Sequence, residues 1–161
     1  MLSKTMEKAL NEQINAELAS AYIYLSMAAY FEATNLRGFA GWMKAQAQEE
    51  QGHALRIYDY VYDRGGKVTL TAIDGPKTAW SSPLDAFTNA YEHERYITGR
   101  INDLVGLARK ENDYATETFL QWFVEEQVEE EATADSIVQQ LTLIGDSAAG
   151  LFMMDRELGS R

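Results

Sequence analysis

The stretch GGKVTLTAIDGPKTAWSS, residues 65–82, carries no helical period and divides the chain into two halves. Gly65 supplies the left-handed backbone that ends a helix, whereas Ser82 followed by Pro83 is a typical helix start, with a capping hydroxyl and a proline at the first helical position. About 16 extended residues reach about 50 Å, and a helix of about 28 residues is about 42 Å long. The stretch can therefore span a whole helix, which predicts that the helices before and after it run parallel.

Two long segments on each side of this stretch place apolar residues in steps of three and four, the spacing of a helix with one buried face. They cover about residues 5–34, 38–64, 83–110 and 113–144. Only a few residues connect the two segments of each half, so each half is expected to be an antiparallel hairpin. The sequence thus predicts an all-α fold: a four-helix bundle over about residues 5–144 with one long crossover between the second and third helices. The piece AAGLFMMDREL predicts a short fifth helix over about residues 147–158.

Length, charge and cysteine content exclude several classes of protein. A chain of 161 residues is expected to form a single domain over residues 1–161. Its net charge of -11 disfavours binding to nucleic acid and favours cations as partners. The sequence has no cysteine, which excludes disulfides, thiolate zinc sites and iron-sulfur clusters. Its first residues contain no apolar run typical of a signal peptide or a membrane span, so we expect a cytoplasmic protein without a membrane partner.

Polar residues interrupt the apolar face of every long helix, close to the middle of that helix. They are Glu17, Glu50 with His53, Glu94, and Gln127 with Glu130. Helices of similar length bring these positions to one level, so the six side chains are expected to converge. Any one of them alone is more often a paired or half-exposed residue, but four converging carboxylates repel one another and lose hydration, at a cost of several kcal/mol per ion. Bound metal offsets that cost, and the four negative charges match two divalent cations.

The types of donor narrow the choice of metal. Glu50 and His53 lie one helical turn apart, and a carboxylate-rich site with one imidazole suits iron or manganese better than zinc or copper. We expect Glu50 to bridge two Fe(II) ions, each of which can give one electron to oxygen. Tyr24, one heptad after Glu17, is a candidate hydrogen-bond donor or electron source at this centre. A tyrosine at the edge of the core with its hydroxyl in water explains Tyr24 equally well.

Four stretches resemble the non-haem ferritins of bacteria and archaea, and the resemblance extends over essentially the whole chain. They are NEQINAELASAYIYLSMAAYF around Glu17, GFAGWMKAQAQEEQGHALRIYDYVYDRGG around Glu50 and His53, YEHE ending at Glu94, and FLQWFVEEQVEEE around Gln127 and Glu130. The resemblance implies a ferroxidase that oxidises Fe(II) with O2 or H2O2. It also implies storage of the iron as a ferric oxyhydroxide mineral inside a hollow homo-oligomeric shell of about 24 subunits.

The resemblance further implies roles for individual residues. Glu17, Glu50 and His53 correspond to the ligands of a first iron, and Glu50, Glu94 and Glu130 to those of a second, with Gln127 beside them. Glu49, Glu126 and Glu129 correspond to a nearby third iron site that shares Glu130. The short fifth helix corresponds to the helix that lines the pores of such shells.

Three departures separate this chain from other di-iron proteins. The segment QVEE, residues 127–130, has no histidine where many di-iron bundles carry a second Glu-x-x-His pair, which argues against a bacterioferritin or an oxygenase-like centre. Gln51 stands where bacterioferritins place a haem-binding methionine, so no haem is expected. The rubredoxin module of rubrerythrins needs cysteines that this chain lacks.

Two other hypotheses compete with iron storage. A miniature ferritin is a dodecamer that shields DNA while it consumes peroxide; such proteins usually place their ligands across a subunit interface and lack a fifth helix. The five-helix pattern and a ligand set drawn from four helices of one chain disfavour it. The other hypothesis is a purely structural bundle whose glutamates are solvated.

Overall fold

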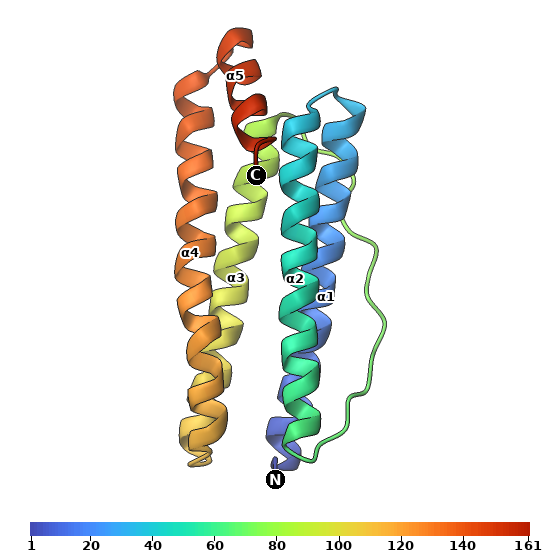
Figure 1. Cartoon of the computed structure of the whole chain (residues 1–161), viewed down its shortest axis with the longest axis vertical. Helices are drawn as coiled ribbons and strands as arrows, with labels where there is room; N and C mark the ends of the chain where they lie inside the picture. The colour runs from blue at the N-terminus through green and yellow to red at the C-terminus, as the bar shows by residue number, and fades with distance from the viewer.

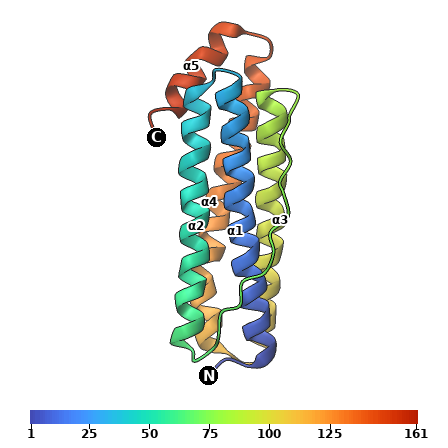
Figure 2. The ribbon, with the colours of Figure 1, turned by 90° about the vertical axis from the view of Figure 1, so that its right-hand side faces the viewer.

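The computed structural model describes residues 1–161, and all of its regular elements are helices (Figure 1). These helices are α1 (Lys4–Ala33), α2 (Arg37–Asp63), α3 (Pro83–Lys110), α4 (Tyr114–Ile144) and α5 (Ala148–Leu158). The first four stand side by side as an elongated bundle, and α5 lies at one end of it (Figures 1 and 2). The predicted all-α fold is confirmed, and the predicted helix ends lie within about one residue of those observed. No helix is both long and apolar enough to span a membrane.

Each of the two short interhelical turns contains an asparagine with a positive φ angle. Asn35 between α1 and α2 has a φ of 61°, and Asn112 between α3 and α4 has a φ of 55°. Asparagine tolerates this left-handed conformation better than most other residues, so each turn can reverse the chain within a few residues. Side-chain caps then start the next helix in three places: Ser82, Asp113 and Ser147 each accept a hydrogen bond from a backbone N–H of the first turn.

The crossover, residues 64–82, runs along the outside of α1 (Figure 2). Near its start Gly65 has a φ of 71°, a left-handed conformation that prevents α2 from continuing. Side chains of α1 hold the crossover at successive levels: Asn11 donates to the Lys67 carbonyl at 2.9 Å, Asn15 to the Thr71 hydroxyl at 2.9 Å, and Ser26 to the Lys77 carbonyl at 2.6 Å. The crossover thus returns the chain to the end of the bundle where α2 began, and α2 and α3 run parallel as predicted.

Two apolar clusters fill the bundle. One, at the α5 end, contains Phe31, Phe39 and Phe87, with the rings of Phe31 and Phe39 stacked at a centroid distance of 5.0 Å. The other contains Leu10 and Leu120, which lie toward the opposite end. Between them all four helices bury polar side chains. Because both flanking clusters are close-packed, they hold the four backbones at fixed positions around this polar layer.

The start of α2 and the end of α5 are in direct contact. The Phe39 backbone N–H donates to Asp155 Oδ1 at 3.0 Å. A Cβ atom at Gly38 would lie 1.7 Å from the Asp155 carbonyl oxygen, so only glycine permits this approach. Met154 fills the adjoining cluster and is 3% exposed. This docking fixes the direction in which the chain leaves α5 and brings Arg161 beside α2.

Candidate metal centre

The six polar residues predicted to converge lie together in the middle of the bundle. They are Glu17 from α1, Glu50 and His53 from α2, Glu94 from α3, and Gln127 and Glu130 from α4, and all six are buried. Five of these residues, together with Glu126, form three groups in which the ligand atoms lie within 4.8 Å of one another: Glu17, Glu50 and His53; Glu50, Glu94 and Glu130; and His53, Glu126 and Glu130. The first two groups contain the residues that the resemblance implies for the two iron positions, and their role as iron ligands stays a prediction. They share Glu50, as a bridging carboxylate requires.

Glu17, on α1, is 1% exposed, and side chains of α1 and α3 hold it. We call this the closed side of the centre. Glu17 Oε1 accepts a hydrogen bond from Gln13 Nε2 at 2.8 Å, and Arg100 Nε donates to Gln13 Oε1 at 2.9 Å. Glu17 Oε2 is buried without a hydrogen-bond donor and lies 3.8 Å from His53 Nδ1. A buried carboxylate oxygen without a donor is costly, so this atom is suited to a cation.

Glu94 is also held on the closed side, by two donors. Tyr24, 1% exposed, donates its hydroxyl hydrogen to Glu94 Oε1. Gln127 Nε2 lies 3.2 Å from Glu94 Oε2 and 3.2 Å from the Thr98 hydroxyl. The alternative of a Tyr24 hydroxyl in water is therefore wrong, because that hydroxyl points into the centre. Its role as an electron source stays a prediction.

Gln46 holds the carboxylates of α2 and α4 on the other side. Its Nε2 donates to Glu130 Oε2 at 2.5 Å and lies 3.3 Å from Glu50 Oε1. Its Oε1 accepts from Arg161 Nη1 at 3.0 Å. Arg161 therefore fixes the orientation of the Gln46 amide, and the Gln46 amide contacts two of the candidate ligands.

Burial and mutual repulsion shift the proton equilibria of these groups. Burial raises the pKa of Glu50 well above its usual value and that of Glu94 above its own. Burial, with the charge of Glu94, raises the pKa of Glu130 to about 7. Burial alone would lower the pKa of His53, but its contacts with Glu17 and Glu50 outweigh this and raise it to about 11. Protons therefore neutralise part of the charge that two divalent cations would otherwise balance, and metal binding should release them.

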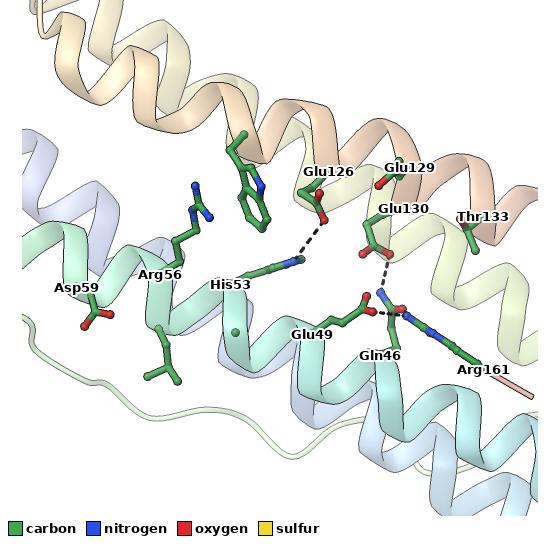
Figure 3. A pocket seen from close by; sticks show the side chains of 13 residues that line it. Gln46, Glu49, His53, Arg56, Asp59, Glu126, Glu129, Glu130, Thr133 and Arg161 are labelled. Atoms are coloured by element: carbon green, nitrogen blue, oxygen red, sulfur yellow. Dashed lines mark hydrogen bonds and ion pairs between the residues drawn. The ribbon is translucent and has the colours of Figure 1, made fainter. Parts of the chain in front are cut away.

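A groove of about 790 Å³ opens beside the centre between α2 and α4 (Figure 3). Glu126 lies in it with Oε2 3.9 Å from His53 Nε2. Glu49 lies across from it and is paired with Arg161 at 2.6 Å, and Glu129 is exposed. The groove thus contains all three residues predicted to form a third iron site. The ligand atoms that come together are, however, those of Glu126 with His53 and Glu130, so the predicted trio stays a prediction.

Four residues that contact the centre or its ligands were not predicted from the sequence: Gln13, Gln46, Arg100 and Arg161. One signal was present: Gln13 and Gln46 each stand four residues before a candidate ligand, Glu17 and Glu50. Side chains at this spacing meet on one helix face, so a repeated Gln-x-x-x-Glu predicts two oriented carboxylates. The arginines could not be found in this way, because Arg100 comes from α3 and Arg161 follows α5.

Comparisons with known proteins agree with this geometry. The ferritin-like domain family matches residues 7–144. The chain is 48% identical to the bacterial non-heme ferritin of Bacteroides fragilis over 161 residues, covering 100% of both chains. It is 45% identical to the bacterial non-heme ferritin of Staphylococcus epidermidis, covering 100% of this chain and 97% of that one.

Two solved structures from the archaeon Archaeoglobus fulgidus are similar over the same length. An open-pore ferritin is 52% identical with a TM-score of 0.99, covering 100% of this chain and 99% of that one. A closed form of the ferritin, engineered by mutagenesis, is 53% identical with a TM-score of 0.99, covering 100% of this chain and 98% of that one. Since the family covers most of the chain and these relatives match its full length, the chain belongs to the ferritin family.

Proposed function

We propose that this protein stores iron and is a ferroxidase, which oxidises Fe(II) to Fe(III) at the buried centre and keeps the product as a ferric oxyhydroxide mineral. The observation that carries the proposal is the pair of donor groups sharing Glu50, buried at one level of a ferritin bundle. Carboxylates with a single imidazole are donors suited to iron. The undonated Glu17 Oε2 supports a cation at this place.

We assign the following roles in Fe(II) binding and oxidation to individual residues. Glu17, Glu50 and His53 hold one Fe(II), and Glu50, Glu94 and Glu130 hold the other, with Gln127 orienting Glu94 by its hydrogen bond. Each Fe(II) gives up one electron, and O2 or H2O2 accepts the pair. Tyr24 fixes the Glu94 carboxylate and is also a candidate electron donor. The groove beside His53 offers room for a third Fe(II) near Glu49, Glu126 and Glu129.

The assembly belongs to the same proposal. We propose a homo-oligomeric shell of about 24 chains in the cytoplasm, each chain folding as one domain over residues 1–161. The similarity to ferritins whose names describe an open pore and a closed form supports a hollow shell. The presence of α5 and the contribution of all four bundle helices to one centre support it over a miniature, DNA-protecting ferritin of about 12 chains.

Anaerobic titration with Fe(II) tests the proposal. The parent protein should bind two to three Fe(II) per chain, as two tight equivalents and a weaker third, and should oxidise them rapidly when O2 or H2O2 is added. A Glu50→Ala, His53→Ala double variant removes the shared ligand and the imidazole, so tight binding should fall by more than about 100-fold. Glu125→Ala is the control, because it removes an exposed glutamate of α4.

Two outcomes would contradict the proposal. Tight binding and rapid oxidation that persist in the double variant would place the chemistry elsewhere. A particle mass corresponding to about 12 chains or to a free subunit would contradict the shell, whatever the titration shows.

A further inference from the structure

Arg161 makes four contacts at the groove, although it lies beyond the last helix. Its Nη2 donates to Glu49 Oε1 at 2.6 Å, and its Nη1 donates to Gln46 Oε1 at 3.0 Å and lies 3.4 Å from the Trp42 carbonyl oxygen. The guanidinium carbon lies 4.8 Å from the centre of the Trp42 ring. The side chain is 29% exposed, so it is seated in the groove and still reaches water (Figure 3).

The positive charge of Arg161 is paired with Glu49, one of the three carboxylates predicted to hold a third iron. The groove is lined by Glu49, Glu126, Glu129 and Glu130. Its other arginine, Arg56, is stacked on the ring of Trp122 at 4.0 Å. Arg161 is therefore the cation paired with Glu49, and a divalent ion that binds Glu49 must compete with it. A guanidinium keeps its charge at any physiological pH, so only displacement can free this carboxylate.

Displacing Arg161 from Glu49 should cost little free energy. Beyond Gly159 the backbone bonds only to the preceding turn: the Ser160 N–H and hydroxyl donate to the Glu157 carbonyl at 3.2 Å and 2.6 Å, and the Arg161 N–H donates to the Leu158 carbonyl at 3.4 Å. The Arg161–Glu49 pair is half in water, where an ion pair contributes little net stability. A divalent cation that replaces Arg161 binds the Glu49 carboxylate, and water then hydrates the released guanidinium.

We propose that Arg161 is a displaceable internal cation: it pairs with Glu49 while the groove holds no metal, and a third Fe(II) must displace it. The inference rests on the proposed function, because it needs Fe(II) as the incoming ion. Arg161 also orients Gln46 toward Glu50 and Glu130. Its departure therefore couples occupation of the groove to the hydrogen bonds of the inner centre, and Arg161 is a positioning residue for that centre.

The test compares anaerobic Fe(II) binding isotherms of the assembled parent protein and three variants. In Arg161→Ala the affinity for the third Fe(II) per chain should rise about ten-fold, since a competing charge is lost. Arg161→Lys keeps a positive charge and should return the third affinity toward that of the parent. Arg156→Ala is the matched control, because it removes an exposed charge from α5 and should behave as the parent.

A double variant separates competition from a general change of charge. In a Glu49→Gln background, the further change Arg161→Ala should leave third-iron binding nearly unaltered, because the two residues act as one unit. A third affinity that is unchanged or weaker in Arg161→Ala would overturn the inference. So would a ten-fold rise in Arg156→Ala. If the parent binds no tight Fe(II), the proposed function itself has failed, which is a different result.

Discussion

On each of two sides of the candidate metal centre an arginine and a glutamine hold the carboxylates, but the space beside them differs: a groove of about 790 Å³ on one side and a pocket of about 190 Å³ on the other. On the closed side, Arg100 holds Gln13 and Gln13 holds Glu17. On the groove side, Arg161 holds Gln46, which contacts Glu130 and Glu50. Gln13 and Gln46 are both buried, but Arg100 comes from within α3, whereas Arg161 lies beyond the last helix. Arg100 is part of a bundle helix and cannot leave Gln13 unless α3 moves, whereas Arg161 lies beyond α5 and can leave the groove without the movement of a helix.

The largest expected difference between the two sides is the loss of unfolding free energy when each glutamine is replaced by alanine. Gln13→Ala leaves the buried Glu17 without its donor and Arg100 Nε without its acceptor, and only a small pocket of about 190 Å³ borders this position, so the metal-free protein should lose about 2–4 kcal/mol of unfolding free energy. Gln46→Ala should cost only about 1–2 kcal/mol, because water from the groove can hydrate Glu130 and Arg161. Denaturant unfolding at one subunit concentration measures both losses. Equal losses would show that the two sides do not differ in hydration.

The second expected effect is that the unfolding free energy of the metal-free protein depends on pH. Folding raises the pKa of Glu130 from 4.5 to about 7, so the folded state binds more protons than the unfolded state between these values. The associated stability is complete below about pH 4.5 and is lost as the pH rises through about 7, with the raised pKa of Glu50 and Glu94 acting in the same direction. His53, whose pKa is raised to about 11, adds a further loss above about pH 6.5.

Thermal unfolding at pH 5 and pH 7.5 measures this effect. The metal-free protein should be less stable at pH 7.5 by on the order of 2 kcal/mol. Saturating Zn(II), a divalent ion without redox chemistry, should reverse the trend, because metal binding needs deprotonated carboxylates. Stability that rises with pH in the metal-free protein would mean that the buried carboxylates are already ionised.

Tyr24→Phe should have the smallest effect of the three and concerns the closed side alone. The variant removes the hydroxyl donor of Glu94 and keeps the ring, so it should cost about 1 kcal/mol of unfolding free energy and weaken Fe(II) binding a few-fold. Tyr22→Phe is the control, since Tyr22 is 49% exposed and should change stability by less than about 0.5 kcal/mol. Indistinguishable behaviour of the two variants would mean that the Tyr24 hydroxyl does not support the centre.

Much of the fold could be predicted because local signals agreed with one another. The length and composition of residues 65–82 implied a crossover as long as a helix, and Gly65, Ser82 and Pro83 marked its ends. Charged residues at the middle of four apolar faces implied convergence, since helices of similar length have their midpoints at one level. The contact between Gly38 and Asp155 could not be predicted, because the close approach of two helices distant in sequence leaves no periodic signal.

The helical period and the helix lengths, both readable in the amino-acid sequence, place Glu17, Glu50, His53, Glu94 and Glu130 at one level inside the bundle. Which of their oxygen atoms accept hydrogen bonds, and which side of the centre is open, follows from how the helices pack. Those properties depend on arginines brought from α3 and from beyond α5. The physical reason is that a helical repeat specifies a face, whereas a hydrogen bond across the bundle depends on the distance between elements that the chain joins through its turns, its crossover and the docking of α5.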